Sequence, residues 1–125
     1  MENRNPDAVR MIERMFPEVG VKGMEFLEKL DPSYRRWWEN TVFGGLYSRE
    51  VLDQKTRELC ALSALVMTGK LAQIRAHILA SHYAGATRDE IQEVIFQTFI
   101  FGGAPVVLGA LETMVEVYLE LEQDE

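Results

Sequence analysis

Residues 54–85 read QKTRELCALSALVMTGKLAQIRAHILASHYAG, and this stretch decides the fold class. Ser63 is the only polar residue between Leu59 and Met67, so the first part predicts a helix that is apolar nearly all round. Such a helix is expected to be central and buried. Gly69 is typical of a helix end, and a second helix is expected to follow it. The stretch therefore indicates an all-α protein.

Helix-start signals occur in the rest of the chain as well. Asn5 and Asp31 are typical N-cap residues, and each is followed by a proline that can take the first helical position. Thr87 and Glu90 have the spacing of a capping box. No alternating pattern typical of a strand and no internal repeat is present. About six or seven helices are expected, over residues 6–16, 20–30, 32–43, 54–68, 70–84, 88–101 and 105–122.

Length and charge narrow the possible function classes. A chain of 125 residues is long enough for one domain with a real core, so a single domain over residues 1–125 is expected, with N-terminal helices in residues 5–42. The net charge of -7 argues against a nucleic acid as partner. No run of eighteen apolar residues predicts a membrane span, and the N-terminus does not resemble a secretory signal. The lone Cys60 fits a reducing compartment, so the cytoplasm is expected.

Two stretches carry more apolar surface than a small helical bundle buries easily. Residues 94–101, VIFQTFIF, present bulky side chains on every face, and the last helix is also broadly apolar. Exposed apolar surfaces of this kind usually mark an interface with another protein chain, so homo-oligomerisation is predicted. A well-wrapped monomer core is the alternative.

Four polar residues share one side of the helix that begins after Gly69. Lys70, Gln73, His77 and Ser81 follow helical spacing, which makes this side either a solvated face or the wall of a pocket. His77 could be a core histidine with one satisfied nitrogen or a catalytic group. His82 points to a different side and is interpreted as structural or partner-contacting.

Glu58 also requires an explanation, because it stands directly before the apolar run. It is either an acid that complements the dipole at the start of its helix or a carboxylate inside a pocket. Cys60, two residues later, is interpreted as a small core hydrophobe.

Other candidate sites are not supported. His77 and His82 are five residues apart, which places them on different helix faces, and no Cys-x-x-Cys accompanies them, so no metal site is expected. The glycine pairs at 44–45 and 102–103 follow no strand and do not indicate a phosphate loop. Trp37 and Trp38 are interpreted as core or interface packing rather than base stacking, because the chain is acidic.

Several motifs occur in an unbroken order over residues 43–118, and together they resemble the carboxymuconolactone decarboxylase family. They are Tyr47-Ser48-Arg49, Lys55-Thr56-Arg57, His77, Thr87 with Glu90, and Gly103 with Pro105.

The same superfamily contains alkylhydroperoxidase D-like proteins, which carry a Glu, a Cys-x-x-Cys and a His. The resemblance places their Glu on Glu58 and their His on His77, whereas their two cysteines fall on Lys70 and Gln73. A peroxidatic site needs a reactive thiolate, usually with a resolving thiol nearby. Cys60 is not expected to replace the pair, because it lies two residues from Glu58 and in the middle of an apolar run that is expected to be buried. A thiol-dependent alkylhydroperoxidase or peroxiredoxin-like activity therefore remains only as a disfavoured alternative.

The resemblance implies a trimer or hexamer that decarboxylates a carboxylated lactone, such as 4-carboxymuconolactone or a related small acidic molecule, without a metal or organic cofactor. His77 would then act as general acid or bind the enolate, and Glu58 would orient or reprotonate it. We expect these two groups, from consecutive helices, to meet at one water-poor cavity with positive charge at its rim. Substrate carboxylates would be bound by Arg57, Arg49 or Lys70, and the pocket would be shaped by Gln73 and Ser81.

Each predicted cation has an ordinary alternative. Arg49 and Arg57 could form ion pairs at the surface or at a subunit interface, and Lys70 could be a solvated lysine at a helix start. A third interpretation of the whole chain is a non-catalytic oligomer that binds a small ligand in a vestigial pocket.

Overall fold

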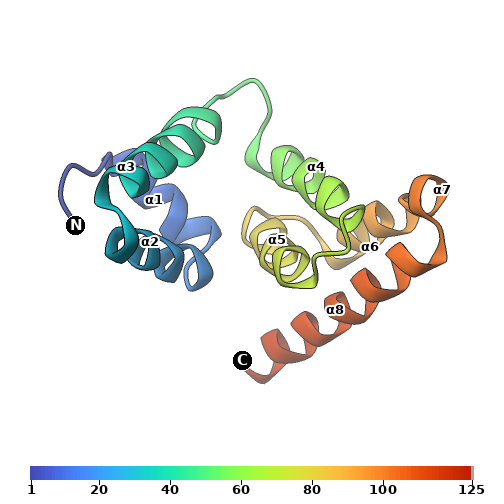
Figure 1. The fold of residues 1–125 in the computed structure, drawn as a ribbon. Helices are drawn as coiled ribbons and strands as arrows, with labels where there is room; N and C mark the ends of the chain where they lie inside the picture. The colour runs from blue at the N-terminus through green and yellow to red at the C-terminus, as the bar shows by residue number, and fades with distance from the viewer. Residues whose placement is uncertain (125) are drawn as a thin grey trace. The chain divides into compact units, whose positions relative to one another are not determined.

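The protein was analysed as a computed structural model in which residues 1–124 are described. Over these residues every regular element is a helix, which confirms the all-α prediction (Figure 1). The chain divides into two compact units, of which the first comprises Met1–Gln54 and the second begins at Lys55. That the whole chain acts as one domain stays a prediction. None of the helices in residues 1–124 combines the length and apolar character needed to cross a membrane.

The first unit holds three α-helices and one π-helix. Asn5 caps the first helix by accepting a hydrogen bond from the backbone N–H of Asp7, and Asp31 caps the third by accepting from those of Ser33 and Tyr34. These caps confirm the predicted starts. The elements are α1 (Pro6–Met15), α2 (Val19–Leu30), α3 (Pro32–Glu39) and the π-helix η1 (Asn40–Leu46).

The glycine pair after α3 does not end the helix, contrary to the prediction. The chain continues through both glycines as η1, and the Tyr47 backbone N–H donates to the Val42 carbonyl. A Cβ on Gly44 would lie 3.1 Å from the Asn5 amide nitrogen, and one on Gly45 would lie 3.3 Å from the Asn40 carbonyl oxygen. The two glycines therefore permit close approaches rather than a helix end.

An aromatic cluster forms the core of this unit together with aliphatic residues of α1. The Phe43 ring lies 5.7 Å from that of Phe16, 5.6 Å from Trp38 and 5.4 Å from Tyr47, measured between centroids. Trp38 is thus the packed member of the tryptophan pair, whereas Trp37 is 60% exposed.

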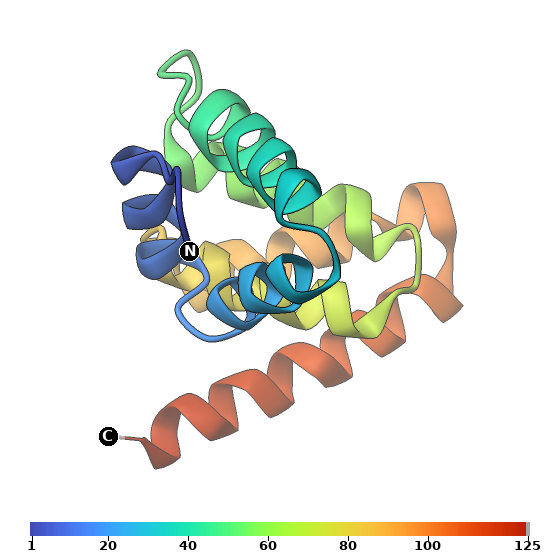
Figure 2. The same cartoon turned by 60° about the vertical axis from the view of Figure 1, so that its left-hand side comes forward.

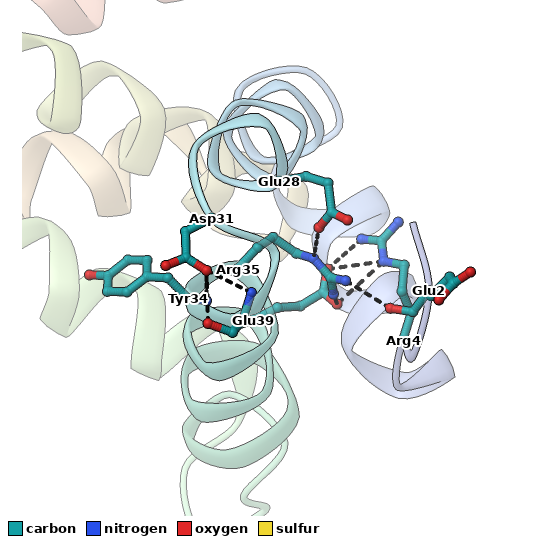
Figure 3. Close-up of polar contacts among 8 residues, drawn as sticks. Glu2, Arg4, Glu28, Asp31, Tyr34, Arg35 and Glu39 are labelled. Atoms are coloured by element: carbon teal, nitrogen blue, oxygen red, sulfur yellow. Dashed lines mark hydrogen bonds and ion pairs between the residues drawn. The ribbon is translucent and has the colours of Figure 1, made fainter.

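A buried ion network joins the N-terminal segment to α2 and α3 (Figure 3). Arg35 and Glu39, one helical turn apart, are fully buried and contact each other at 3.0 Å. Arg35 also pairs with Glu28 at 2.7 Å and donates to the backbone carbonyl of Glu2, while Arg4 pairs with Glu39. Buried charges are tolerated only when they are paired, and this network supplies the pairs.

The second unit consists of α4 (Gln54–Val66) from Lys55 onward, α5 (Leu71–Tyr83), α6 (Arg88–Gln97), the single turn α7 (Phe99–Gly102) and α8 (Ala104–Gln123). The long α8 packs against α5, α6 and α7, as both ribbon views show (Figures 1 and 2). The core of the unit is aliphatic and is built mainly from Leu62, Val66, Ile74, Ile78, Ile91, Ile95, Val107, Met114 and Val117.

The predicted boundaries of the later helices are largely confirmed. Thr87 and Glu90 form the expected capping box at the start of α6, with both reciprocal hydrogen bonds present. Gly103 has a φ of 75°, which separates α7 from α8 and suits glycine. The stretch expected as one helix is interrupted at Thr98, so that α6 and α7 are distinct.

The first part of the opening stretch is less buried than predicted. Only Glu58, Leu62 and Val66 are fully buried on α4, and they follow a four-residue spacing along one face. Cys60 is exposed, so its interpretation as a core residue is wrong. The reason is geometric, because Cys60 lies about 200° around the helix from Glu58 and from Leu62. The apolar run therefore does not have a single environment, because only one face of the helix is fully buried.

Candidate functional site

The two residues expected to act together do meet in the second unit. Glu58 on α4 and His77 on α5 are in direct contact through the carboxylate Oε1 and the imidazole Nδ1. The side chain of Glu58 is fully buried, whereas that of His77 keeps 16% of its surface exposed. Gly69, with a φ of 69°, lies in the turn between the two helices and suits the left-handed conformation there.

This placement rules out one of the two interpretations of Glu58, whereas a pocket around its carboxylate stays a prediction. It is the fifth residue of α4, no acidic residue lies in the first turn, and its carboxylate is buried. The interpretation as a dipole-complementing acid at the helix start is therefore wrong. A buried carboxylate is costly without a partner, and His77 is one partner that the structure provides.

The pair has a defined chemical capability. With a carboxylate against Nδ1, the imidazole is held in one orientation. A histidine whose ring reaches the surface can exchange a proton with a bound molecule. The arrangement suits a general acid or a donor to a developing oxyanion.

The other three polar residues on the same side of α5 as His77 differ in how exposed they are. Ser81 is fully buried, and its hydroxyl donates to the backbone carbonyl of His77 at 2.7 Å, one turn earlier. Lys70 and Gln73 are exposed near the start of α5. This side of α5 is therefore not a uniform solvated face, because its first residues are exposed and its last one is buried.

The two predicted arginines lie in different units. Arg57 precedes Glu58 on α4 and is half-buried. Arg49 belongs to the first unit, where it is exposed and lines a cavity of about 650 Å³. Other residues of this cavity, Arg14, Glu50 and Gln54, were missed by sequence reasoning, because no pattern in the chain relates α1 to the segment that precedes α4.

His82 has the structural surroundings expected for it. Its ring contacts those of Tyr83 and Tyr118, with centroids 5.4 and 5.9 Å away. The Arg88 guanidinium lies 5.1 Å from the centroid of the Tyr118 ring. Burial raises the pKa of the Tyr118 phenol above its ordinary value, and the nearby Arg88 charge opposes this. Among residues 1–124, no group of three or more His, Cys, Asp or Glu side chains could hold a metal ion.

Comparison with known proteins gives one family and two relatives. The sequence model described as the carboxymuconolactone decarboxylase family matches residues 32–116. A protein of Paracoccus denitrificans, described as an uncharacterized 15.0 kDa protein in the nqo9-nqo10 intergenic region, is 40% identical over 103 residues, which cover 81% of this chain and 77% of that protein. The 4-carboxymuconolactone decarboxylase of Acinetobacter baylyi is 26% identical over 100 residues, covering 80% of this chain and 75% of that enzyme.

Proposed function

The chain belongs to the carboxymuconolactone decarboxylase family, and from this premise we propose that it is a cofactor-free decarboxylase of a carboxylated lactone or a related small acidic molecule. The observation that supports the proposal most directly is the contact of the buried Glu58 carboxylate with the His77 imidazole. The similarity to the Acinetobacter baylyi enzyme suggests 4-carboxymuconolactone as the first substrate to try.

In the proposed reaction the bond between the ring carbon and the departing carboxylate breaks, and carbon dioxide leaves. The electron pair passes through the conjugated double bond to the lactone carbonyl, whose oxygen becomes an enolate. His77, held by Glu58, supplies one proton, which is added to carbon as the enolate returns to the lactone carbonyl. Atoms and electrons balance without a reductant.

The remaining predicted residues have supporting roles in this proposal. Lys70 and Arg57, which belong to the same unit as His77, are the cations assigned to substrate carboxylates. The role of Arg49, which belongs to the first unit, stays a prediction. Gln73 is assigned to the pocket wall. Ser81 acts by positioning, because its hydroxyl is bonded to the backbone of His77. Self-association as a trimer or hexamer is part of the same proposal.

The test is carbon dioxide release from 4-carboxymuconolactone and a panel of small carboxylated lactones and 3-oxo acids. His77→Gln should lower turnover by about 10²- to 10⁴-fold, the range for loss of a general acid. The matched control is His82→Gln, which changes the other histidine and should leave the rate within a few-fold of the parent. Full activity of a folded His77→Gln protein would refute the assigned role.

The same assay separates the alternatives. The exposed Cys60 is accessible to alkylation, so a thiol-dependent reaction would be abolished by a thiol reagent and by Cys60→Ser. The decarboxylase proposal expects no effect of either. Saturable binding of these compounds without release of carbon dioxide would instead favour a non-catalytic ligand-binding protein.

A further inference from the structure

A small cavity lies in the second unit between α4, the end of α6 and α7. Its volume is about 200 Å³, which is below the roughly 300–1,000 Å³ of small-molecule pockets but above the about 150 Å³ that holds a benzene molecule. The cavity therefore has room for one large apolar side chain. The residues that line it are Ser63, Ala64, Met67, Gln97, Thr98 and Phe101.

The cavity wall is uncharged and offers few hydrogen bonds. The Ser63 hydroxyl donates to the Cys60 carbonyl at 2.8 Å, and the Thr98 hydroxyl donates to the Ile95 carbonyl at 2.6 Å. Both hydroxyl protons are thus already used by nearby backbone groups. None of the described residues that line the cavity is charged. An apolar occupant therefore fits it better than an acidic molecule does.

Large apolar side chains of α7 protrude beside this cavity, at one end of the second unit (Figure 1). Phe101 forms part of the cavity wall, and its neighbour Ile100 is 79% exposed, the highest value in the turn. The turn packs closely on α4 here, since a Cβ on Gly102 would lie 3.1 Å from the Met67 sulfur. The unit thus presents a protruding side chain, Ile100, next to a hole that can hold a side chain of its size.

The surface around α7 is an uncharged part of an acidic chain. Residues 94–111 contain no charged residue, although the net charge of the chain is -7. Two copies with the same net charge repel each other, so they approach most easily through uncharged surfaces. At roughly 150–200 Å² for each fully exposed side chain, Met67, Phe99, Ile100 and Phe101 leave roughly 400 Å² in solvent. This is about half of the roughly 800 Å² that each partner contributes to a standard interface.

We propose that this surface is a two-fold contact between copies of the chain, in which Ile100 of each copy enters the cavity beside Ala64 of the other. A two-fold contact is self-complementary, and it suits a protruding side chain and its hole that lie next to each other on one surface. The inference rests on the self-association included in the proposed function and specifies it. A trimer has no two-fold axis, so of the two proposed assemblies only a hexamer of two trimers contains this contact.

Native mass spectrometry of the full chain tests the contact. Ile100→Glu places a charge on the protruding side chain, and Ala64→Lys places one in the cavity. Both positions are exposed, so neither change disturbs the core of the unit. The parent should be a hexamer, and each variant alone should have half of its mass, because an interface core excludes an unpaired charge. Ala72→Lys is the matched control, since it makes the same change at an exposed alanine outside the cavity and should keep the parent's mass.

Mixing the two interface variants makes the test specific. Across a mixed pair, the new carboxylate of one copy meets the new amine of the other, and the second half of the contact keeps its parent residues. Ile100→Glu and Ala64→Lys together should therefore regain the parent's mass, with one trimer of each variant in every hexamer. Ile100→Glu mixed with Ala72→Lys should form no such mixed hexamer.

The outcomes separate this inference from the proposed function. A trimeric parent, or an equal loss of mass in Ala72→Lys, would overturn the two-fold contact, and so would a mixture that fails to recover although circular dichroism shows both variants to be folded. A monomeric parent would overturn it together with the proposed self-association. Failure of the decarboxylase proposal would appear instead in the carbon dioxide assay of the parent, whatever the measured masses are.

Discussion

At the scale of single residues, a polar atom in the interior has to be explained by a partner, and Tyr118 is the clearest exception in the second unit. Its phenol oxygen is buried and has no hydrogen-bond partner within residues 1–124, although its ring contacts His82 and Arg88. The ring contacts do not need the hydroxyl. The hydroxyl therefore costs desolvation without a compensating bond.

Tyr118→Phe should for this reason raise the free energy of unfolding by about 1 kcal/mol. Urea denaturation of the parent and the variant at one protein concentration measures the difference. Tyr34→Phe is the control, because its side chain is 48% exposed and the same change should be near neutral. A loss of stability in Tyr118→Phe would mean that the hydroxyl has a partner in the assembled protein.

Single residues also show which features of the candidate site can be predicted from the sequence alone. The convergence of Glu58 and His77 was predicted from the family resemblance, and the two side chains do contact each other. The placement of Cys60 was predicted wrongly, because an apolar run does not reveal which of its faces is buried. The contact of the Gln54 amide with the Met11 sulfur could not be predicted, since Met11 belongs to a distant helix.

At the scale of elements, caps were the most predictable feature because they are local. Asn5, Asp31 and the Thr87–Glu90 capping box act within two or three residues of themselves, so the sequence contains the whole interaction. The π-helix η1 was not predictable, because its glycines serve contacts with Asn5 and Asn40 rather than a helix end.

The stability that Glu90 contributes at the start of α6 is expected to depend on pH. A hydrogen bond from Lys55 and the backbone N–H of Thr87 hold the pKa of Glu90 below its ordinary value of 4.5. A carboxylate with a lowered pKa in the folded state stabilises the protein above its unfolded pKa, and this contribution disappears as the pH falls through the folded value. Acidification below pH 4.5 should therefore remove the stabilisation.

Glu90→Gln isolates this charge, because glutamine retains the capping-box hydrogen bond. The variant should be less stable than the parent at neutral pH, and the two should converge as the pH drops below 4.5. Thermal denaturation across the acid range measures the convergence. Glu93→Gln, an exposed change on the same helix, should give no such pH-dependent gap, and a gap of constant size in Glu90→Gln would contradict the argument.

The ion network around Arg35 links α2, α3 and the N-terminal segment of the first unit, and its loss should reduce stability more than loss of the Glu90 charge. Arg35→Met preserves much of the side-chain volume but leaves the fully buried Glu39 with one cationic partner fewer. Removal of one member of a buried pair costs about 3–5 kcal/mol, so the variant should lose about that amount of stability.

The control for this experiment is Arg10→Met, because Arg10 and its partner Asp7 are 69% and 68% exposed. Exposed pairs contribute less than about 1 kcal/mol. Comparable losses in the two variants, measured by urea denaturation, would show that the buried network has no special role.

At the scale of the whole molecule, the exposed apolar surface of the second unit supports the proposed self-association. Phe99, Ile100 and Phe101 are 57%, 79% and 77% exposed, and they are consecutive residues of the single turn α7. Leu108 on α8 adds a further 58% exposed side chain. Three large apolar residues in one exposed turn have no role in the core of the unit, and a second copy of the chain is the partner that the proposal assigns to them.

Ile100→Asp places a charge in the middle of this turn without touching the core, since its side chain is 79% exposed. Light scattering coupled to size exclusion should find the parent as a trimer or hexamer and the variant as smaller species with retained helicity, because an interface core excludes an unpaired charge. Val51→Asp, at an 80% exposed position of the first unit, adds the same charge and should keep the parent's mass. A parent protein that is monomeric at all concentrations would contradict the proposal. An unchanged mass for Ile100→Asp beside an oligomeric parent would instead show that α7 lies outside the interface.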